Sequence, residues 1–351
     1  MAQGEKQGAA GWQKCWEYSA EDLSGKPVAS DNDNIYLSRL NGNVEAISRH
    51  GGERVWLAEL GGSPASAVFP SQGVVYAATR PLGEDGSPSD EIVIRSLNKN
   101  SGLIGWTAKI PSKSDVFLNA ENGILTVISE SGAVYRMQGD TGAVLWQTAL
   151  GAKLAAPPAF SGSGAIVGTD QGSLIAVSAD GVPGVSQVKV GRIPSALGAA
   201  GGRAVFGDSL GNVVLYDLNS RKRLWRLKLG GGVSHVTYDD GRILAASLDN
   251  FVYLIAADNG NVVWKRRQPG RVVLGPLLNK EYAVVMAIGE RSAVLIDRSN
   301  GKTRGQVTLP EGAEFVQSPV GSPDTIIFPL STGLESYSSA GCGGQKETGR
   351  A

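Results

Sequence analysis

Short apolar runs separated by turn residues repeat along the whole chain. The runs are four to six residues long and rich in Val, Ile and aromatic residues, as in 124–128 and 251–255. Turns such as Asp140–Gly142 and Asp258–Gly260 follow many of them, and a glycine there supplies a positive φ without a Cβ clash. Runs of this kind predict β-strands, and no segment shows a sustained 3.6-residue period with helix caps. We therefore expect an all-β chain with four strands in every ~40 residues.

Six of the seven tryptophans mark the period of this repeat. They are separated by 40, 50, 40, 79 and 39 residues and are Trp16, Trp56, Trp106, Trp146, Trp225 and Trp264. Two registers without tryptophan fall near Ser186 and Gly305, and Trp12 stands outside the series. Eight registers of ~40 residues predict an eight-bladed β-propeller with four-stranded blades. Each of the six tryptophans is expected to pack between blades, so that its loss would reduce stability.

The last blade must borrow a strand from the other end of the chain. Residues 315–338 supply only three strands, and no complete blade precedes Trp16. The N-terminal strand around Trp16 is therefore expected to complete the last blade, which removes an open sheet edge. This predicts one propeller domain over residues 12–340, between a flexible segment 1–11 and a flexible tail 341–351. Ring closure would bring Cys15 near Cys342, either as a disulfide that locks the ring or as two free thiols.

Composition and charge restrict the functional classes. Lys plus Arg equals Asp plus Glu, at 33 each, which gives no support for bulk nucleic-acid binding. No apolar run approaches the ~20 residues of a transmembrane helix. The N-terminus has no apolar stretch of the signal-peptide type. The protein is therefore expected to be either cytoplasmic or exported with its signal removed.

Two local charge features stand out from this neutral average. One is an acidic, Pro/Gly-rich insertion at 80–91, interpreted as a solvated loop or as a partner contact. The other is a basic surface expected on the outer strands of two adjacent blades, formed by Arg221, Lys222, Arg223, Arg226, Lys228, Lys265, Arg266, Arg267 and Arg271. Such a surface is either an ordinary solvated outer face or a docking face for an acidic protein or an anionic surface.

Catalytic chemistry is poorly represented in the chain. The two histidines, His50 and His235, are 185 residues apart, and no nucleophile-elbow, HExxH, CxxC or P-loop motif occurs. Acidic residues recur before the third strand of five blades, which indicates turn chemistry: Glu130, Asp170, Asp208, Asp249 and Glu290. The expected innermost strands are small and neutral. We therefore predict no catalytic residue, no metal site, no cofactor and no enzyme activity.

The repeat resembles that of the quinoprotein-like, or PQQ-repeat, propellers, whose blades end in a tryptophan-docking motif. Residues 139–146 and 257–264 carry this motif, and 146–160 is similar to a blade junction of the BamB family. That resemblance covers nearly the whole chain. It implies a non-enzymatic, monomeric scaffold for outer-membrane β-barrel assembly, in the periplasm or at the outer membrane, with the periplasmic domains of a BamA-like protein as its partner. The matching contact residues would be Lys153, Leu154, Arg192 and Ile193.

The chain departs from that family in two respects, and two other functions stay open. It shows no lipobox around Cys15, and it extends beyond the last blade from Gly341 to Ala351. One alternative is another propeller interaction module with an unknown partner. The other is a quinone-dependent enzyme, although such dehydrogenases carry adjacent cysteines and calcium-binding acids that are not apparent here.

Overall fold

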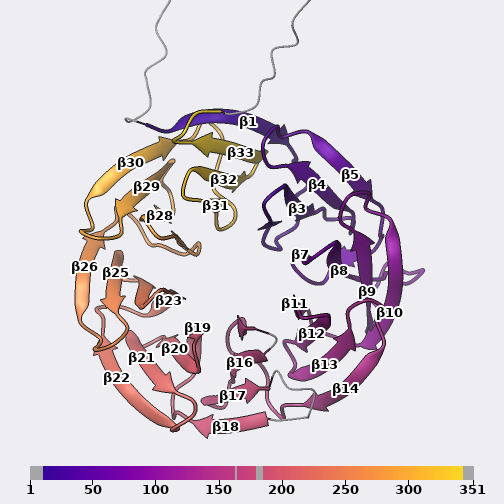
Figure 1. The fold of residues 1–351 in the computed structure, drawn as a ribbon, viewed down its shortest axis with the longest axis horizontal. Coiled ribbons are helices and arrows are strands. Elements are labelled where there is room, and N and C mark those ends of the chain that lie inside the picture. The colour runs from indigo at the N-terminus through magenta and orange to yellow at the C-terminus, as the bar shows by residue number, and fades with distance from the viewer. Residues whose placement is uncertain (1–10, 163, 179–184, 343–351) are drawn as a thin grey trace, which may run out of the picture.

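The chain folds into a ring of eight β-sheets around a central axis (Figure 1). The computed structural model describes residues 11–162, 164–178 and 185–342, and all regular elements within them are β-strands. The predicted all-β, eight-bladed propeller is confirmed. The segments 1–11 and 341–351 fall almost entirely outside the described residues, so their flexibility stays a prediction.

Each blade runs from an inner to an outer strand through antiparallel neighbours. Blade 1 contains β2 (Ala29–Ser30), β3 (Asn34–Ser38), β4 (Val44–Ser48) and β5 (Arg54–Ala58). Blade 2 contains β6 (Ser63–Pro64), β7 (Phe69–Pro70), β8 (Val74–Arg80), β9 (Glu91–Asn98) and β10 (Ile104–Pro111). Blade 3 contains β11 (Val116–Glu121), β12 (Ile124–Ser129), β13 (Ala133–Gln138) and β14 (Val144–Ala149), and blade 4 contains β15 (Ala159–Ser161), β16 (Gly164–Gly168), β17 (Ser173–Val177) and β18 (Val185–Lys189). Blade 2 has an interrupted inner edge, because β6 and β7 both pair with β8.

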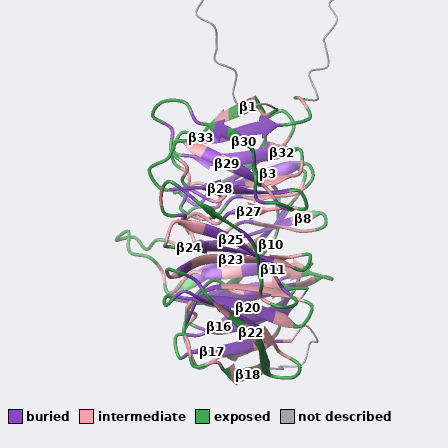
Figure 2. Cartoon of the chain, turned by 90° about the vertical axis from the view of Figure 1, so that its left-hand side faces the viewer, coloured by how far each residue is buried: buried purple, intermediate pink, exposed green. Residues whose placement is uncertain are grey.

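Blades 5 to 8 follow the same plan. Blade 5 contains β19 (Pro194–Ala200), β20 (Arg203–Asp208), β21 (Asn212–Asp217) and β22 (Lys222–Lys228), and blade 6 contains β23 (Val233–Asp239), β24 (Arg242–Ser247), β25 (Phe251–Ala256) and β26 (Val262–Arg267). Blade 7 contains β27 (Leu277–Leu278), β28 (Tyr282–Met286), β29 (Ser292–Asp297) and β30 (Thr303–Thr308). Blade 8 contains β31 (Val320–Ser322), β32 (Thr325–Leu330), β33 (Gly333–Ser338) and β1 (Gln13–Ser19). Most buried residues lie within the strands, and the connections on both faces of the disc are mostly exposed (Figure 2).

The N-terminal strand completes the last blade, as expected from the strand count. β1 pairs antiparallel with β33, with Trp16 opposite Ser336 and Tyr18 opposite Leu334. Cys15 and Cys342 are joined in a disulfide across 327 residues of sequence. Of the two states that the sequence left open, the structure therefore contains the bonded one.

Five of the six periodic tryptophans dock on the next blade in the same way. The indole Nε1 donates to a carbonyl in the turn between the third and fourth strands of that blade, at 2.8 Å for Trp56 and 2.9 Å for Trp225. The ring lies flat on the last glycine of that turn, so that a Cβ on Gly260 would come within 2.8 Å of Trp225. These glycines also have positive φ, which is 76° at Gly260. The position therefore requires glycine for both space and backbone conformation.

The docking glycine changes where its tryptophan is missing. Blade 4 carries Ser186 at the register expected for tryptophan, in a strand paired with β17. The corresponding turn position of blade 5 is Arg221, which keeps the positive φ, at 54°. A side chain is tolerated there because no indole from blade 4 covers the turn. The absence of tryptophan from blade 4 and the absence of glycine from the facing turn of blade 5 thus have the same cause.

Trp12, which stands outside the sequence repeat, fills the second gap. Blade 7 has Gly305 at its tryptophan register, and a Cβ on this residue would contact Trp12 at 3.4 Å. Trp12 meets Tyr282 of the same blade edge-on, with ring centroids 5.7 Å apart. Trp56 and Tyr36 of blade 1 also form a pair, with ring centroids 6.0 Å apart and planes tilted by 41°. Although Trp12 stands outside the sequence period, the N-terminal segment thus supplies the ring that blade 7 lacks.

We predict that Gly260→Ala destabilises the chain more than Gly241→Ala, in the same blade. Both glycines have positive φ, 76° and 69°, so both variants carry similar backbone strain of about 1–2 kcal/mol. Only the Gly260 Cβ meets an indole, whereas nothing lies within 4 Å of one at Gly241. Overpacking should add about 1–3 kcal/mol, measurable by urea unfolding. Equal losses would mean that the indole contact does not restrict this position.

The disulfide is expected to contribute to stability in addition to the strand pairing of β1. The double variant Cys15→Ser/Cys342→Ser should lower the free energy of unfolding by roughly 2–4 kcal/mol, because the unfolded chain gains freedom when the cross-link is removed. Mass analysis after alkylation without reductant checks the bond itself. Two alkylated thiols in the native protein would contradict it.

Candidate interaction surface

One face of the disc collects two kinds of connection. They are the turn between the second and third strands of each blade and the loop from each outer strand to the next inner strand. Both lie on the same side because the chain crosses the disc an even number of times between them. We call this side the loop face. All four contact residues implied by the family resemblance lie on it: Lys153 and Leu154 between β14 and β15, and Arg192 and Ile193 between β18 and β19.

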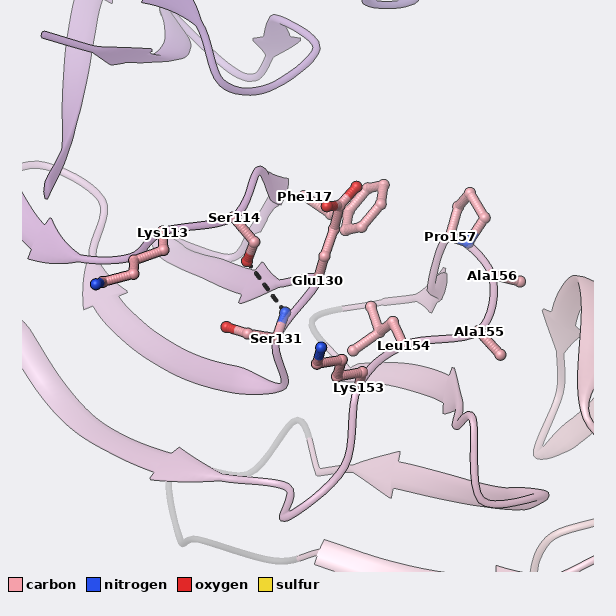
Figure 3. A pocket seen from close by; sticks show the side chains of 10 residues that line it. All are labelled: Lys113, Ser114, Phe117, Glu130, Ser131, Lys153, Leu154, Ala155, Ala156 and Pro157. Carbon is pink, nitrogen blue, oxygen red and sulfur yellow. Dashed lines mark hydrogen bonds between the residues drawn. The ribbon is translucent and has the colours of Figure 1, made fainter. Parts of the chain in front are cut away.

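Lys153 and Leu154 line a cleft of about 540 Å³ between blades 3 and 4 (Figure 3). Phe117 and Glu130 of blade 3 form its other side. The Leu154 N–H donates to the Glu130 carbonyl at 2.9 Å, so the two blades are joined by backbone at the base of the cleft. The cleft is thus lined by basic, acidic and apolar side chains on a backbone that joins the two blades.

Arg192 and Ile193 differ in what they offer to a partner. Ile193 is 56% exposed. Arg192 instead donates to the buried carboxylate of Asp208 at 3.1 Å, which also accepts from the N–H of Asn212 at 2.8 Å. Burial alone would raise the pKa of Asp208, but the hydrogen bonds from Asn212 and the Arg192 guanidinium hold it below its ordinary value. Arg192 is therefore partly structural, and Arg192→Glu would place a second carboxylate beside a buried one.

A single turn connects these two pairs of residues. The Asp170 N–H donates to the Lys153 carbonyl at 3.0 Å, and the Gly191 N–H donates to the Gly172 carbonyl at 3.1 Å. The turn between β16 and β17 is thus bonded to both loops. The structure brings the four residues onto neighbouring loops of blades 4 and 5, with this turn between them.

The loop face also carries exposed aliphatic side chains that the sequence analysis did not identify. Leu210 and Ile288 are 64% and 59% exposed, in turns where polar residues are usual. Leu248, Val273 and Val316 are exposed on the same face. Val273, Leu274, Ile288 and Phe315 line a second cleft of about 410 Å³ at blade 7. An apolar residue beside the turn glycine or aspartate is the sequence signal that marks Leu210 and Leu248.

The recurrent acids support the turns, as predicted from their spacing, in the two blades where their bonds are clearest. Asp208 binds Asn212, and Asp249 accepts from the Phe251 N–H at 3.1 Å and from the Tyr253 hydroxyl at 2.9 Å. The acidic insertion lies between β8 and β9, as expected. Arg80 anchors its base by donating to the carbonyls of Ser89 and Ser112 at 2.8 and 2.6 Å.

Charged residues adjoin two of the inner strands. Lys26 and Asp115, in the loops that lead into the inner strands of blades 1 and 3, form an ion pair, and Arg80 at the end of β8 also pairs with Asp115. His235 lies on the inner strand β23, and its Nδ1 is buried without a hydrogen-bond partner in the part of the chain that the structure describes. Burial lowers the pKa of its imidazole.

A quinone and calcium site does not fit the residues present. Among residues 11–162, 164–178 and 185–342, no group of three or more His, Cys, Asp or Glu could hold a metal ion. Cys15 and Cys342 are bonded to each other rather than to a sequence neighbour.

The blades form a propeller ring, and the inter-blade loops line two clefts on one of its faces. Residues 2–109, 89–183 and 183–324 match the family model described as outer membrane protein assembly factor BamB. The chain therefore belongs to the BamB family.

Individual relatives agree with this family assignment. The outer membrane protein assembly factor BamB of Yersinia pestis is 22% identical over 325 residues, which cover 85% of this chain and 80% of the relative. That of Bordetella pertussis is 26% identical over 323 residues, covering 85% and 79%. In the described part of the chain, no helix has the length and apolar character needed to cross a membrane.

Solved structures show the fold alone. The crystal structure of BamB from Moraxella catarrhalis matches with a TM-score of 0.69 at 15% identity, over 93% of this chain and 97% of that chain. The computationally designed Ika8 protein matches with a TM-score of 0.77 at 11% identity, over 93% and 99%. A designed ring thus superposes as well as a natural relative, and function has to be sought in the loops.

We predict that His235 makes stability depend on pH. The unfolded chain takes up a proton near pH 6.5, the ordinary pKa of histidine, where the folded chain does not. Stability should therefore be fully retained above pH 6.5 and decrease as the pH falls below it. His235→Gln should reduce this dependence in thermal unfolding between pH 5 and 7.5. A wild-type slope retained in His235→Gln would contradict this assignment.

Proposed function

We propose that this chain is a non-enzymatic scaffold for the assembly of outer-membrane β-barrel proteins, and that its loop face binds the periplasmic domains of a BamA-like partner. The observation that carries this proposal is the match of almost the whole chain to the BamB family model. Relatives that match over about four fifths of their own length bear the same description. The proposal places the protein in the periplasm or at the outer membrane.

The loop face supplies the chemistry that such a partner requires. Ile193 and Leu210 offer apolar anchors on blade 5, and Lys153 stands exposed beside the cleft of blade 4. A few aliphatic anchors with a charged rim are typical of protein interfaces. The blades themselves are held by strand pairing and indole docking, so that loop residues are free to vary with the partner. Arg192 is assigned a supporting role through Asp208.

Binding of isolated BamA-like periplasmic domains tests this proposal directly. The variant Lys153→Glu/Ile193→Glu should bind at least about tenfold more weakly, which corresponds to about 1.4 kcal/mol, because an apolar anchor is lost and a charge is reversed. The control Leu103→Glu/Lys302→Glu makes the same chemical changes at exposed turns on the opposite face and should bind normally. Calorimetry measures the affinities.

Two results would overturn the proposal. If the wild-type chain does not bind the domains, the partner is a different protein. If both variants lose affinity equally, the contact does not lie on the loop face. Arg192→Glu is unsuitable as a probe, because it disturbs the buried carboxylate of Asp208.

A further inference from the structure

The outer rim of blades 5 and 6 carries a concentration of positive charge. The two outer strands, β22 and β26, contain seven basic residues and no acidic residue: Lys222, Arg223, Arg226, Lys228, Lys265, Arg266 and Arg267. We call these seven side chains the basic wall. β22 and β26 follow each other along the rim of the ring (Figure 1). The adjacency expected from the sequence is thereby confirmed.

These charges are not neutralised by the protein. None of the seven forms an ion pair with an acidic side chain within the described residues. Elsewhere on the surface, exposed lysines do pair, as Lys109 does with Glu91 at 3.5 Å and Lys113 with Asp90 at 2.9 Å. All seven residues of the wall are exposed. The wall is therefore a local excess of positive charge on a chain whose total charge is zero.

Aliphatic side chains are interleaved with the basic ones. Leu224 is 44% exposed, and Val262 and Val263 are each 41% exposed. They lie on the same two strands as the cations. A rim that served only to be solvated would carry polar residues at these positions. Basic residues alternating with exposed aliphatic ones are typical of surfaces that meet a lipid headgroup layer.

The arrangement favours a bilayer over other polyanions. Nucleic acid would need exposed aromatic rings for stacking, but Trp225 and Trp264 are engaged with the next blade through Ala257 and Arg298. An acidic protein surface would bring charged groups against the aliphatic side chains of Leu224, Val262 and Val263, which cannot pair with charge. A bilayer accommodates both kinds of side chain, since phosphates meet the cations and the aliphatic groups reach the acyl boundary.

We infer that the basic wall docks the propeller edge-on against a bilayer of anionic phospholipid. The wall is on the rim, so that the ring axis would run parallel to the membrane surface. The loop face would then stand perpendicular to the membrane and stay open to a neighbouring protein. This inference goes beyond the proposed function, because it assigns a second surface and does not depend on which partner the loop face binds.

Vesicle co-sedimentation of the full chain tests this inference. The probes are vesicles of phosphatidylglycerol with phosphatidylethanolamine, and matched vesicles of phosphatidylcholine. The wild-type chain should bind the anionic vesicles at low salt, release them at ~0.5 M NaCl because of charge screening, and ignore phosphatidylcholine. The variant Lys222→Gln/Arg223→Gln/Arg267→Gln should bind at least tenfold more weakly, since each basic residue near an anionic surface contributes about fivefold to the binding constant.

A matched variant separates the wall from general electrostatics. Arg54→Gln/Lys109→Gln/Lys113→Gln removes the same charge from exposed positions on blades 1 to 3 and should bind vesicles like the wild type. Equal loss in both variants would overturn the inference, as would absence of binding to anionic vesicles. Binding of polyglutamate or of DNA through the wall, without vesicle binding, would assign the wall to an acidic protein or to nucleic acid and would also overturn it.

Failure of this inference is distinguishable from failure of the proposed function. The loop-face variant Lys153→Glu/Ile193→Glu should bind vesicles normally and lose the BamA-like domains. The wall variant should show the reverse. The substituted wall residues are exposed, so unchanged thermal unfolding of the wall variant would show that its fold is intact.

Discussion

The indole that reaches from one blade to the turn of the next is the contact on which the ring depends. A four-stranded blade cannot bury both of its faces, so it is stable only against its neighbours. The tryptophan fills the widening space at the rim and also donates a hydrogen bond to a carbonyl of the following blade, as at Trp225 and Ala257. Each docking therefore sets the relative position of two blades. Gly260 and its equivalents are consequences of this contact, since their lack of a side chain gives the indole its place.

Much of the architecture was predictable from the sequence because tryptophan marked six of the eight blades at a regular spacing. The tryptophan spacing was enough to predict the number of blades. The missing fourth strand of the last blade was enough to predict ring closure by the strand around Trp16. Trp12 was not predictable, because its partner Gly305 lies almost 300 residues later and no pattern links the two. The paired tyrosine on β28 is the only local sign of an aromatic neighbour at that blade.

The candidate site was less predictable than the fold. Its four residues could be placed on the right loops because loop positions follow from the repeat. Their individual environments could not, since they depend on contacts between blades. The sequence predicted the same partner-contact role for Arg192 and Lys153. Arg192 is instead bonded to buried Asp208, whereas Lys153 is exposed. Exposed Leu210 and Ile288 were overlooked because a single apolar residue in a turn does not change a strand pattern.

Closure through β1 has a consequence for the order of folding. Within the described residues, the strand that begins the propeller pairs with β33 alone, which is among the last described segments of the chain. During synthesis from the N-terminus, blades 1 to 7 can therefore stack progressively while β1 has no partner strand. Unpaired edges invite association with other chains. The interval between emergence of β1 and arrival of β33 is thus the period in which this protein most needs protection from its neighbours.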